Sequence, residues 1–135
     1  MNTNKFHGNS ARIAFAIALL AGLAALPACR TVVVDPQSNT FGEARFGELQ
    51  VVANHDFETV YKAVKAGLAD RKLFVVQDDK QYAEADLHAR DSVDTLITVK
   101  IKEVAKDRTS VKVRYGLSSD PANAQALYND IARRF

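Results

Sequence analysis

The sequence lacks a second cysteine, because Cys29 is the only one among 135 residues. An internal disulfide is therefore excluded, and the fold must be held together by burial of apolar side chains. The chain also lacks H-E-x-x-H, G-x-S-x-G and a glycine-rich phosphate loop, the motifs that mark zinc sites, serine nucleophiles and nucleotide sites. We therefore expect no enzyme activity, no catalytic residue, no metal site and no cofactor in this chain.

The few residues with catalytic chemistry have simpler explanations. His55 lies beside Asp56, where a strand is expected to give way to a helix. This pair is a candidate metal ligand or general base, but a carboxylate at such a position more often caps the helix. His88 falls with Asp86 and Arg90 on the outer side of an expected strand, which indicates a solvated surface.

Acidic residues are absent from the first 28 positions, which contain the basic residues Lys5 and Arg12. All 16 acidic residues follow, together with 16 of the 18 basic ones. The chain from Cys29 onward thus has no net charge, which gives no electrostatic case for binding nucleic acid or anionic lipid. Its length suits one domain with a single core.

No apolar run in the sequence is long enough to span a bilayer. The longest, over residues 13–26, has 14 residues, and as a helix it covers about 21 Å of a roughly 30 Å hydrocarbon core. Lys5 and Arg12 precede it, and a basic segment followed by a short apolar one is typical of a signal peptide. We therefore predict that residues 1–28 are a signal peptide rather than a transmembrane helix.

The apolar run ends in Leu26-Pro27-Ala28-Cys29, which resembles the lipobox of a bacterial lipoprotein precursor. The resemblance implies that Cys29 carries a covalent lipid such as palmitate and becomes the first residue of the mature chain. A free thiol and plain secretion are the alternatives, but ordinary cleavage after Ala28 would put Leu26 where a small residue is required. Arg30, in place of aspartate after the cysteine, resembles the pattern of Gram-negative lipoproteins sent to the outer membrane, facing the periplasm.

Residues 29–45 are expected to be the lipidated N-terminus and a flexible tether. Asp35 to Thr40 has the composition of turns and linkers. Such a tether reaches at most about 55 Å, and about 22 Å on average. Val32 to Val34 either forms an extra β-strand or rests at the lipid headgroups, and the sequence leaves both alternatives open.

Residues 46–135 predict one small α+β domain. The expected order is β-α-β-β-β-β-α, a mostly antiparallel sheet with two helices covering one face, which is similar to a helix-grip arrangement. Strands are expected over 46–53 and 73–77, and helices begin at Asp56 and near Asp120-Pro121. Three further strands alternate apolar and polar residues, with core positions Ala83, Ala85, Leu87 and Ala89, then Ile97, Val99 and Ile101, then Val111, Val113, Tyr115 and Leu117.

The apolar faces of these three strands share one side of the sheet only if the hairpin loops have an odd number of residues. Three-residue loops over 92–94 and 105–107 satisfy this condition, and the first places Asp86 opposite Lys100 and Glu84 opposite Lys102. Lys112 and Arg114 then remain free on the outer face as a possible partner surface. Gly67, in the first helix, is expected to let that helix approach the sheet closely.

The chain resembles the domain-of-unknown-function 3568 group of small bacterial envelope lipoproteins. The likeness covers the signal with Cys29, Gly47-Glu48-Leu49, the Asp56-capped helix with Val60-Tyr61, the strand around 109–116 and the closing helix. It implies the fold and the lipid anchor, and it implies no activity.

Two functions remain as expectations. The first is a non-enzymatic interaction or assembly module, anchored in the cell envelope through its lipid and binding an envelope protein or a cell-wall polymer. The alternative is a carrier of a small apolar ligand or lipid, because Phe57, Tyr61, Tyr128 and Phe135 are expected between sheet and helices.

Overall fold

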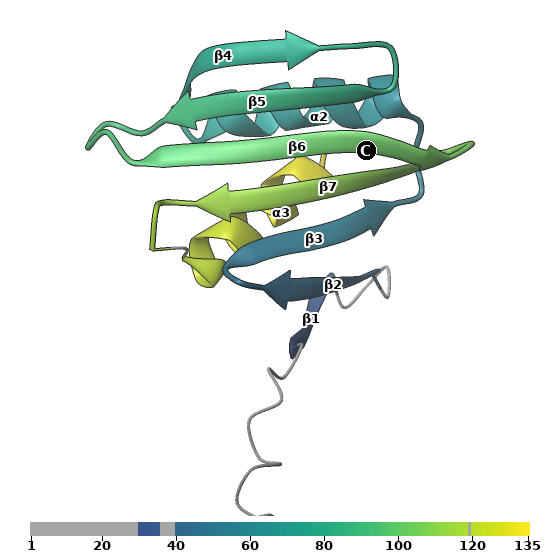
Figure 1. Cartoon of the computed structure of the whole chain (residues 1–135), viewed down its shortest axis with the longest axis horizontal. Coiled ribbons are helices and arrows are strands. Elements are labelled where there is room, and N and C mark those ends of the chain that lie inside the picture. The colour runs from purple at the N-terminus through teal and green to yellow at the C-terminus, as the bar shows by residue number, and fades with distance from the viewer. Residues whose placement is uncertain (1–29, 36–39, 119) are drawn as a thin grey trace, which may run out of the picture.

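The computed structural model describes residues 30–35, 40–118 and 120–135. These residues form one open antiparallel sheet of seven strands, in the order β1-β2-β3-β7-β6-β5-β4, with two helices on one face (Figure 1). The elements are β1 (Arg30–Asp35), β2 (Thr40–Arg45), β3 (Glu48–Ala53), α2 (Phe57–Asp70), β4 (Phe74–Lys80), β5 (Glu84–Arg90), β6 (Leu96–Ala105), β7 (Arg108–Tyr115) and α3 (Pro121–Ala132). The predicted α+β class is confirmed, and from β3 onward so is the element order.

Strands β1 and β2 occupy most of the segment that was expected to be a tether. Arg30 pairs with Ala44, and Gly42 to Arg45 pair with β3. The prediction of a flexible tether is thereby corrected for these two strands, whereas residues 29 and 36–39 lie outside the described residues. The sequence left open whether Val32 to Val34 form a strand or rest at lipid headgroups. They form part of β1, and valine is a residue type enriched in strands.

The core lies between the sheet and the two helices. Inward-facing side chains alternate along the four strands β3, β5, β6 and β7, as predicted, and the buried ones are Leu49, Val51, Ala53, Ala85, Leu87, Ala89, Ile97, Val99, Ile101, Val111 and Val113. Leu117 was expected to continue this face, but it is exposed. Strand β7 ends at Tyr115, and Gly116 then adopts a positive φ of 74° that turns the chain away.

The strand registers agree with the predicted pairings. Asp86 is opposite Lys100 and Glu84 is opposite Lys102. The second hairpin differs in detail, because β6 and β7 are joined by two residues, Lys106 and Asp107, with a register shift between Glu103 and Ala105. This bulge supplies the odd residue that the predicted three-residue loop would have supplied, so both strands still face the core correctly.

Both helices begin at the predicted caps. The Asp56 carboxylate accepts the Thr59 N–H at 2.9 Å, and Asp120 accepts the N–H groups of Ala122 and Asn123. Gly67 does not serve the purpose expected of it, because a side chain there would meet Ile131 of α3 instead of the sheet. Its smallness sets the distance between the helices. No helix in the described residues is long and apolar enough to cross a membrane.

Candidate interaction surface

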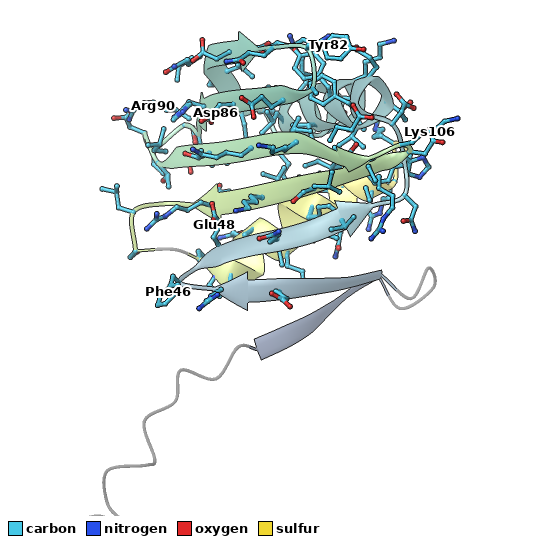
Figure 2. The ribbon with its side chains drawn as sticks, turned by 45° about the vertical axis from the view of Figure 1, so that its right-hand side comes forward. Phe46, Glu48, Tyr82, Asp86, Arg90 and Lys106 are labelled. Atoms are coloured by element: carbon cyan, nitrogen blue, oxygen red, sulfur yellow. The ribbon has the colours of Figure 1, made fainter. Side chains whose placement is uncertain are left out.

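The sheet face opposite the helices is uncovered and polar (Figure 2). Strands β6 and β7 lie in the middle of this face and carry four basic side chains that point outward: Lys100, Lys102, Lys112 and Arg114. The register places Lys100 directly opposite Lys112, and Arg114 opposite Thr98. Basic side chains therefore gather at the centre of the sheet, with Glu48 of β3 directly opposite Arg114.

Two of these four basic groups are neutralised by the neighbouring strand β5. Lys100 Nζ lies 3.1 Å from Asp86 Oδ2, and Lys102 Nζ lies 3.5 Å from Glu84 Oε2. The predicted cross-strand pairs are thus confirmed. Among the side chains that the structure describes, neither Lys112 nor Arg114 forms an ion pair. We call Lys112 and Arg114 the central basic pair.

Asp86 of β5 has charged or titratable neighbours on its own strand and on the edge strand β4. His88 Nε2 is 3.3 Å from Asp86 Oδ1, and this oxygen is buried and accepts no hydrogen bond from a described residue. Asp79 of β4 is directly opposite Asp86, and its carboxylate accepts a hydrogen bond from Gln77 Nε2. His88 therefore belongs to the outer polar face, as the sequence predicted.

The His55-Asp56 pair is a helix start. The Asp56 carboxylate is occupied by the hydroxyl and the backbone N–H of Thr59, and these hydrogen bonds lower its pKa from the ordinary value. The His55 carbonyl accepts the Thr109 hydroxyl at 2.9 Å, and the imidazole packs on Phe135 with ring centroids 4.7 Å apart. The helix-cap interpretation of this pair is confirmed, and every group around it has a structural use.

A polar network that the sequence did not predict joins the edge strand β4 to helix α2. Asp78 accepts the Tyr61 hydroxyl at 2.7 Å and lies 2.8 Å from Lys65 Nζ. Lys80 forms an ion pair with Glu58 at 2.6 Å, and its ammonium lies 4.5 Å from the Tyr61 ring centroid. The side chains of β4 are all exposed, so these contacts replace apolar packing. The sequence did contain a signal for this network. Tyr61 and Lys65 are four residues apart and share one helical face, and Asp78 and Lys80 alternate along the next strand.

Replacing Asp78 with asparagine is expected to lower the free energy of unfolding by about 1 kcal/mol at neutral pH, since partly exposed pairs contribute little more. The Lys65 ammonium, and then the Tyr61 hydroxyl, lower the pKa of Asp78 in the folded chain. A carboxylate whose pKa is lower when folded loses its stabilising effect as the pH falls through the unfolded value of about 3.9 and then the folded one.

The measurement is urea unfolding of wild type and Asp78→Asn at pH 7 and at pH 3. The difference between them should shrink at the lower pH. Asp79→Asn is the matched control, because the neighbouring carboxylate points to the other face and bonds Gln77. An equal loss of stability in both variants at both pH values would contradict the role given to Asp78.

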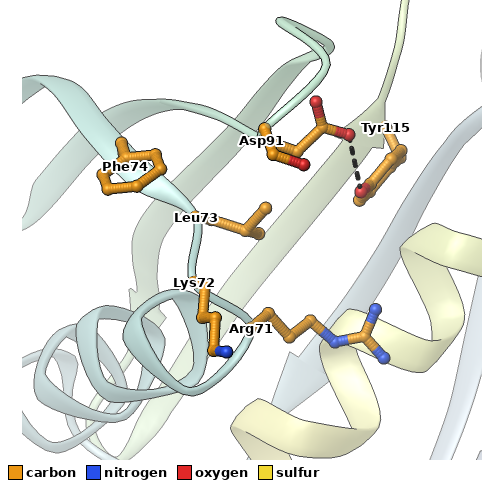
Figure 3. Close-up of a pocket in the computed structure, with 7 residues that line it drawn as sticks. Arg71, Lys72, Leu73, Phe74, Asp91 and Tyr115 are labelled. Atoms are coloured by element: carbon orange, nitrogen blue, oxygen red, sulfur yellow. Dashed lines mark hydrogen bonds between the residues drawn. The ribbon is translucent and has the colours of Figure 1, made fainter.

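Two shallow hollows lie at opposite ends of the sheet. The first, of about 470 Å³, is lined by the end of α2, the start of β4, the β5–β6 loop and Tyr115 (Figure 3). In it, Asp91 accepts the N–H groups of Thr95 and Val93, which lower its pKa, and the Tyr115 hydroxyl. Asp91 therefore orders its own loop. The second hollow, of about 530 Å³, borders the start of α2 and the β4–β5 loop.

Neither hollow extends beneath α3. Helix α3 contributes no lining residue to them, and its inward side chains Ala124, Leu127, Tyr128 and Ile131 are buried. Phe57 is buried too, while Tyr61 and Phe135 pack partly buried against the core. The space that the carrier hypothesis assigned to a ligand is thus occupied by these side chains.

The predicted lipidation site lies outside the described residues. This holds for Cys29 and for the lipobox residues Leu26, Pro27 and Ala28. Among the residues that are described, no three His, Cys, Asp or Glu side chains cluster so as to hold a metal ion.

Comparison with known protein families gives a match over almost the whole chain. A family model described as "Protein of unknown function (DUF3568)" covers residues 11–134. The match includes the apolar run, the Leu26-Pro27-Ala28-Cys29 segment and every strand and helix described above. No curated protein matches the sequence.

Proposed function

The chain belongs to the DUF3568 family, and on that premise we propose that it is a lipid-anchored envelope protein acting as a non-enzymatic interaction or assembly module. Its anchor is a lipid on Cys29, and its location is the periplasmic face of the outer membrane. The support for the anchor is the Leu26-Pro27-Ala28-Cys29 sequence after a short apolar run.

The observation that carries the interaction role is the uncovered sheet face with the central basic pair. Lys112 and Arg114 lie on β7, the middle strand of seven, which is hydrogen-bonded to β3 on one side and to β6 on the other. Neither of the two residues forms an ion pair with a described side chain, whereas Lys100 and Lys102 beside them do. The nearest carboxylate in the register is that of Glu48, directly opposite Arg114 on β3. A polar surface with two basic side chains outside any described ion pair suits a partner that offers carboxylates, either an envelope protein or a cell-wall polymer.

Replacing Cys29 with serine is expected to remove the lipid, and with it the attachment to the membrane. Two or more acyl chains anchor a protein firmly, since each buried CH₂ contributes about 0.8 kcal/mol. The variant should be released as a soluble domain or remain an uncleaved precursor. Its domain should stay folded, because the buried apolar core begins at Leu49.

Cell fractionation and mass spectrometry of the mature N-terminus test this expectation. Wild type should carry a lipid mass on Cys29 and sediment with membranes. An unmodified N-terminus in a soluble wild type would refute the anchor, and so would a serine variant that is processed and retained like wild type.

Crosslinking in whole cells tests the partner. A carboxylate-to-amine crosslinker should trap a reproducible product with wild type, and the double variant Lys112→Glu, Arg114→Glu should lose it. The matched control is Lys106→Glu, Arg108→Glu, which reverses the same charges on exposed residues at the β6–β7 turn. A product that survives in the first double variant, or no product above background in wild type, counts against this surface.

The packed interior is the reason to prefer this function over the alternative of an apolar-ligand carrier. A carrier needs a cavity between sheet and helices. Tyr128 and Leu127 are buried there, and the two hollows described lie at the ends of the sheet instead.

A further inference from the structure

Four large apolar side chains are exposed at one end of the sheet, three of them in connections and one at the start of a strand. Phe46 is 79% exposed in the β2–β3 turn, Val93 is 79% exposed in the β5–β6 loop, Leu117 is 88% exposed after β7, and Phe74 is 66% exposed where α2 leads into β4. We call these four residues the apolar rim. An apolar group of this kind is not needed for folding, because none of the four packs in the core.

The strand registers place the four connections side by side. Glu48 pairs with Arg114, Tyr115 with Ile97, Leu96 with Arg90, and Arg90 with Phe74. From β3 to β4 the sheet crosses four strand spacings, so the rim is about 19 Å wide. Figure 2 shows Phe46 and Arg90 at this end and Lys106 at the other.

The opposite end of the sheet is different in character. Its turns carry Gln81, Lys106 and Asp107, and the exposed large apolar residues described there are Tyr82 and Val104. The rim is joined on its own side by Val75 and Val76, which are exposed near the start of β4. Exposed apolar surface is therefore concentrated at one end.

The chain enters the sheet at this same end. Arg30, the first residue of β1, pairs with Ala44, two positions before Phe46. Position 29 is bonded to Arg30, so its Cα lies about 3.8 Å away. Arg30, the first described residue, thus lies on the edge strand β1 at the same end of the sheet as the rim.

We propose that the apolar rim rests on the lipid bilayer, so that the strands stand end-on at the membrane surface and the β6–β7 turn points away from it. This inference rests on the proposed lipidation of Cys29, which would place the acyl chains beside Phe46. With the anchor joined directly to the sheet, part of the domain must touch the headgroups. The end that carries the anchor is also the end whose side chains gain by leaving water.

The charged neighbours of the rim are compatible with a headgroup layer. The Arg45 guanidinium lies 5.4 Å from the Phe46 ring centroid, and Lys72 is two residues before Phe74. Long basic side chains can keep their charge at the phosphates while an aromatic neighbour goes deeper. Asp94, next to Val93, is paired with Arg90 at 2.9 Å. The Asp91 carboxylate in the same loop accepts the N–H groups of Val93 and Thr95.

The absence of tryptophan from the sequence gives a clean reporter experiment. Leu117→Trp and Phe46→Trp place single tryptophans on the rim, and Tyr82→Trp places one at the far end as a matched control, all at exposed positions. Each lipidated full-length mature protein is reconstituted in phosphatidylcholine vesicles with or without bromine on the acyl chains.

Brominated lipid is expected to lower the emission of the two rim tryptophans about twofold, because interfacial side chains reach about 5–10 Å into the headgroup and acyl boundary. The emission of Tyr82→Trp should stay unchanged. Equal quenching at both ends, or none at the rim, would overturn the end-on orientation.

The same samples separate this failure from failure of the anchor. Mass spectrometry and vesicle flotation show whether Cys29 is lipidated and whether the protein is bound. A lipidated, floating protein whose rim is not quenched leaves the anchor standing and refutes the orientation. A protein without lipid refutes the anchor itself, and with it the basis of the orientation.

Discussion

Tyr128→Ala is expected to lower the free energy of unfolding by about 3–5 kcal/mol, the range found when a buried aromatic side chain is removed. Tyr128 is 1% exposed and is among the largest fully buried side chains of the core. Its removal leaves a cavity between α3 and the sheet that the surrounding residues fill only in part. A domain of this size has about 5–15 kcal/mol of stability in total, so the variant should be marginal.

Urea unfolding followed by circular dichroism measures this loss. Tyr82→Ala is the matched control, because it makes the same chemical change at a residue that is 97% exposed, and it should shift stability by less than about 0.5 kcal/mol. A small effect of Tyr128→Ala would mean that the interior tolerates an empty space. That outcome would favour the carrier function over the packed core described above.

Gly67→Ala is expected to destabilise the domain by about 1–3 kcal/mol, although alanine is the better helix former by about 1 kcal/mol. A Cβ at this position would lie 2.7 Å from Ile131 Cγ1 and 3.3 Å from Ile131 Cα. The first contact can be relieved by a change of rotamer, but the second requires the α3 backbone to move. Overpacking therefore outweighs the gain in helix propensity.

A double-mutant cycle with Ile131→Ala isolates this contact. The smaller residue removes Cγ1, so Gly67→Ala should cost less in that background than in wild type. A stability increase for Gly67→Ala in wild type, near the value expected from propensity alone, would show that the two helices have room to separate.

Which side chains of each strand face the core could be predicted, because apolar and polar residues alternate along a strand that is buried on one face. Ile97, Val99 and Ile101 alternate with polar residues, and the pairing of Asp86 with Lys100 followed from the parity of one loop. The central basic pair was predicted on the same grounds, since Lys112 and Arg114 alternate with the core-facing residues Val111, Val113 and Tyr115. In each of these cases the information lies within one strand or one hairpin.

The features that could not be predicted depend on contacts between elements that are distant in the sequence. Gly67 was correctly singled out as a place of close approach, but nothing in α2 alone says that its neighbour is Ile131. Strand β2 has the polar sequence Thr-Phe-Gly-Glu-Ala-Arg, which forms a strand because β3 offers an unpaired edge to it. The apolar rim was likewise invisible, because its four members meet only after the sheet has formed.

Under the proposed lipid anchoring, the construction of strand β4 has a consequence for molecules that are crowded together on one membrane. A free sheet edge is a template on which a neighbour's strand can add, and confinement to a surface raises the frequency of such encounters. Strand β4 is interrupted by a register shift between Val75 and Gln77 and places Asp78 and Lys80 on its inward face. Both features hinder the addition of a further strand. Strand β4 is therefore a poor template for a strand of a neighbouring molecule.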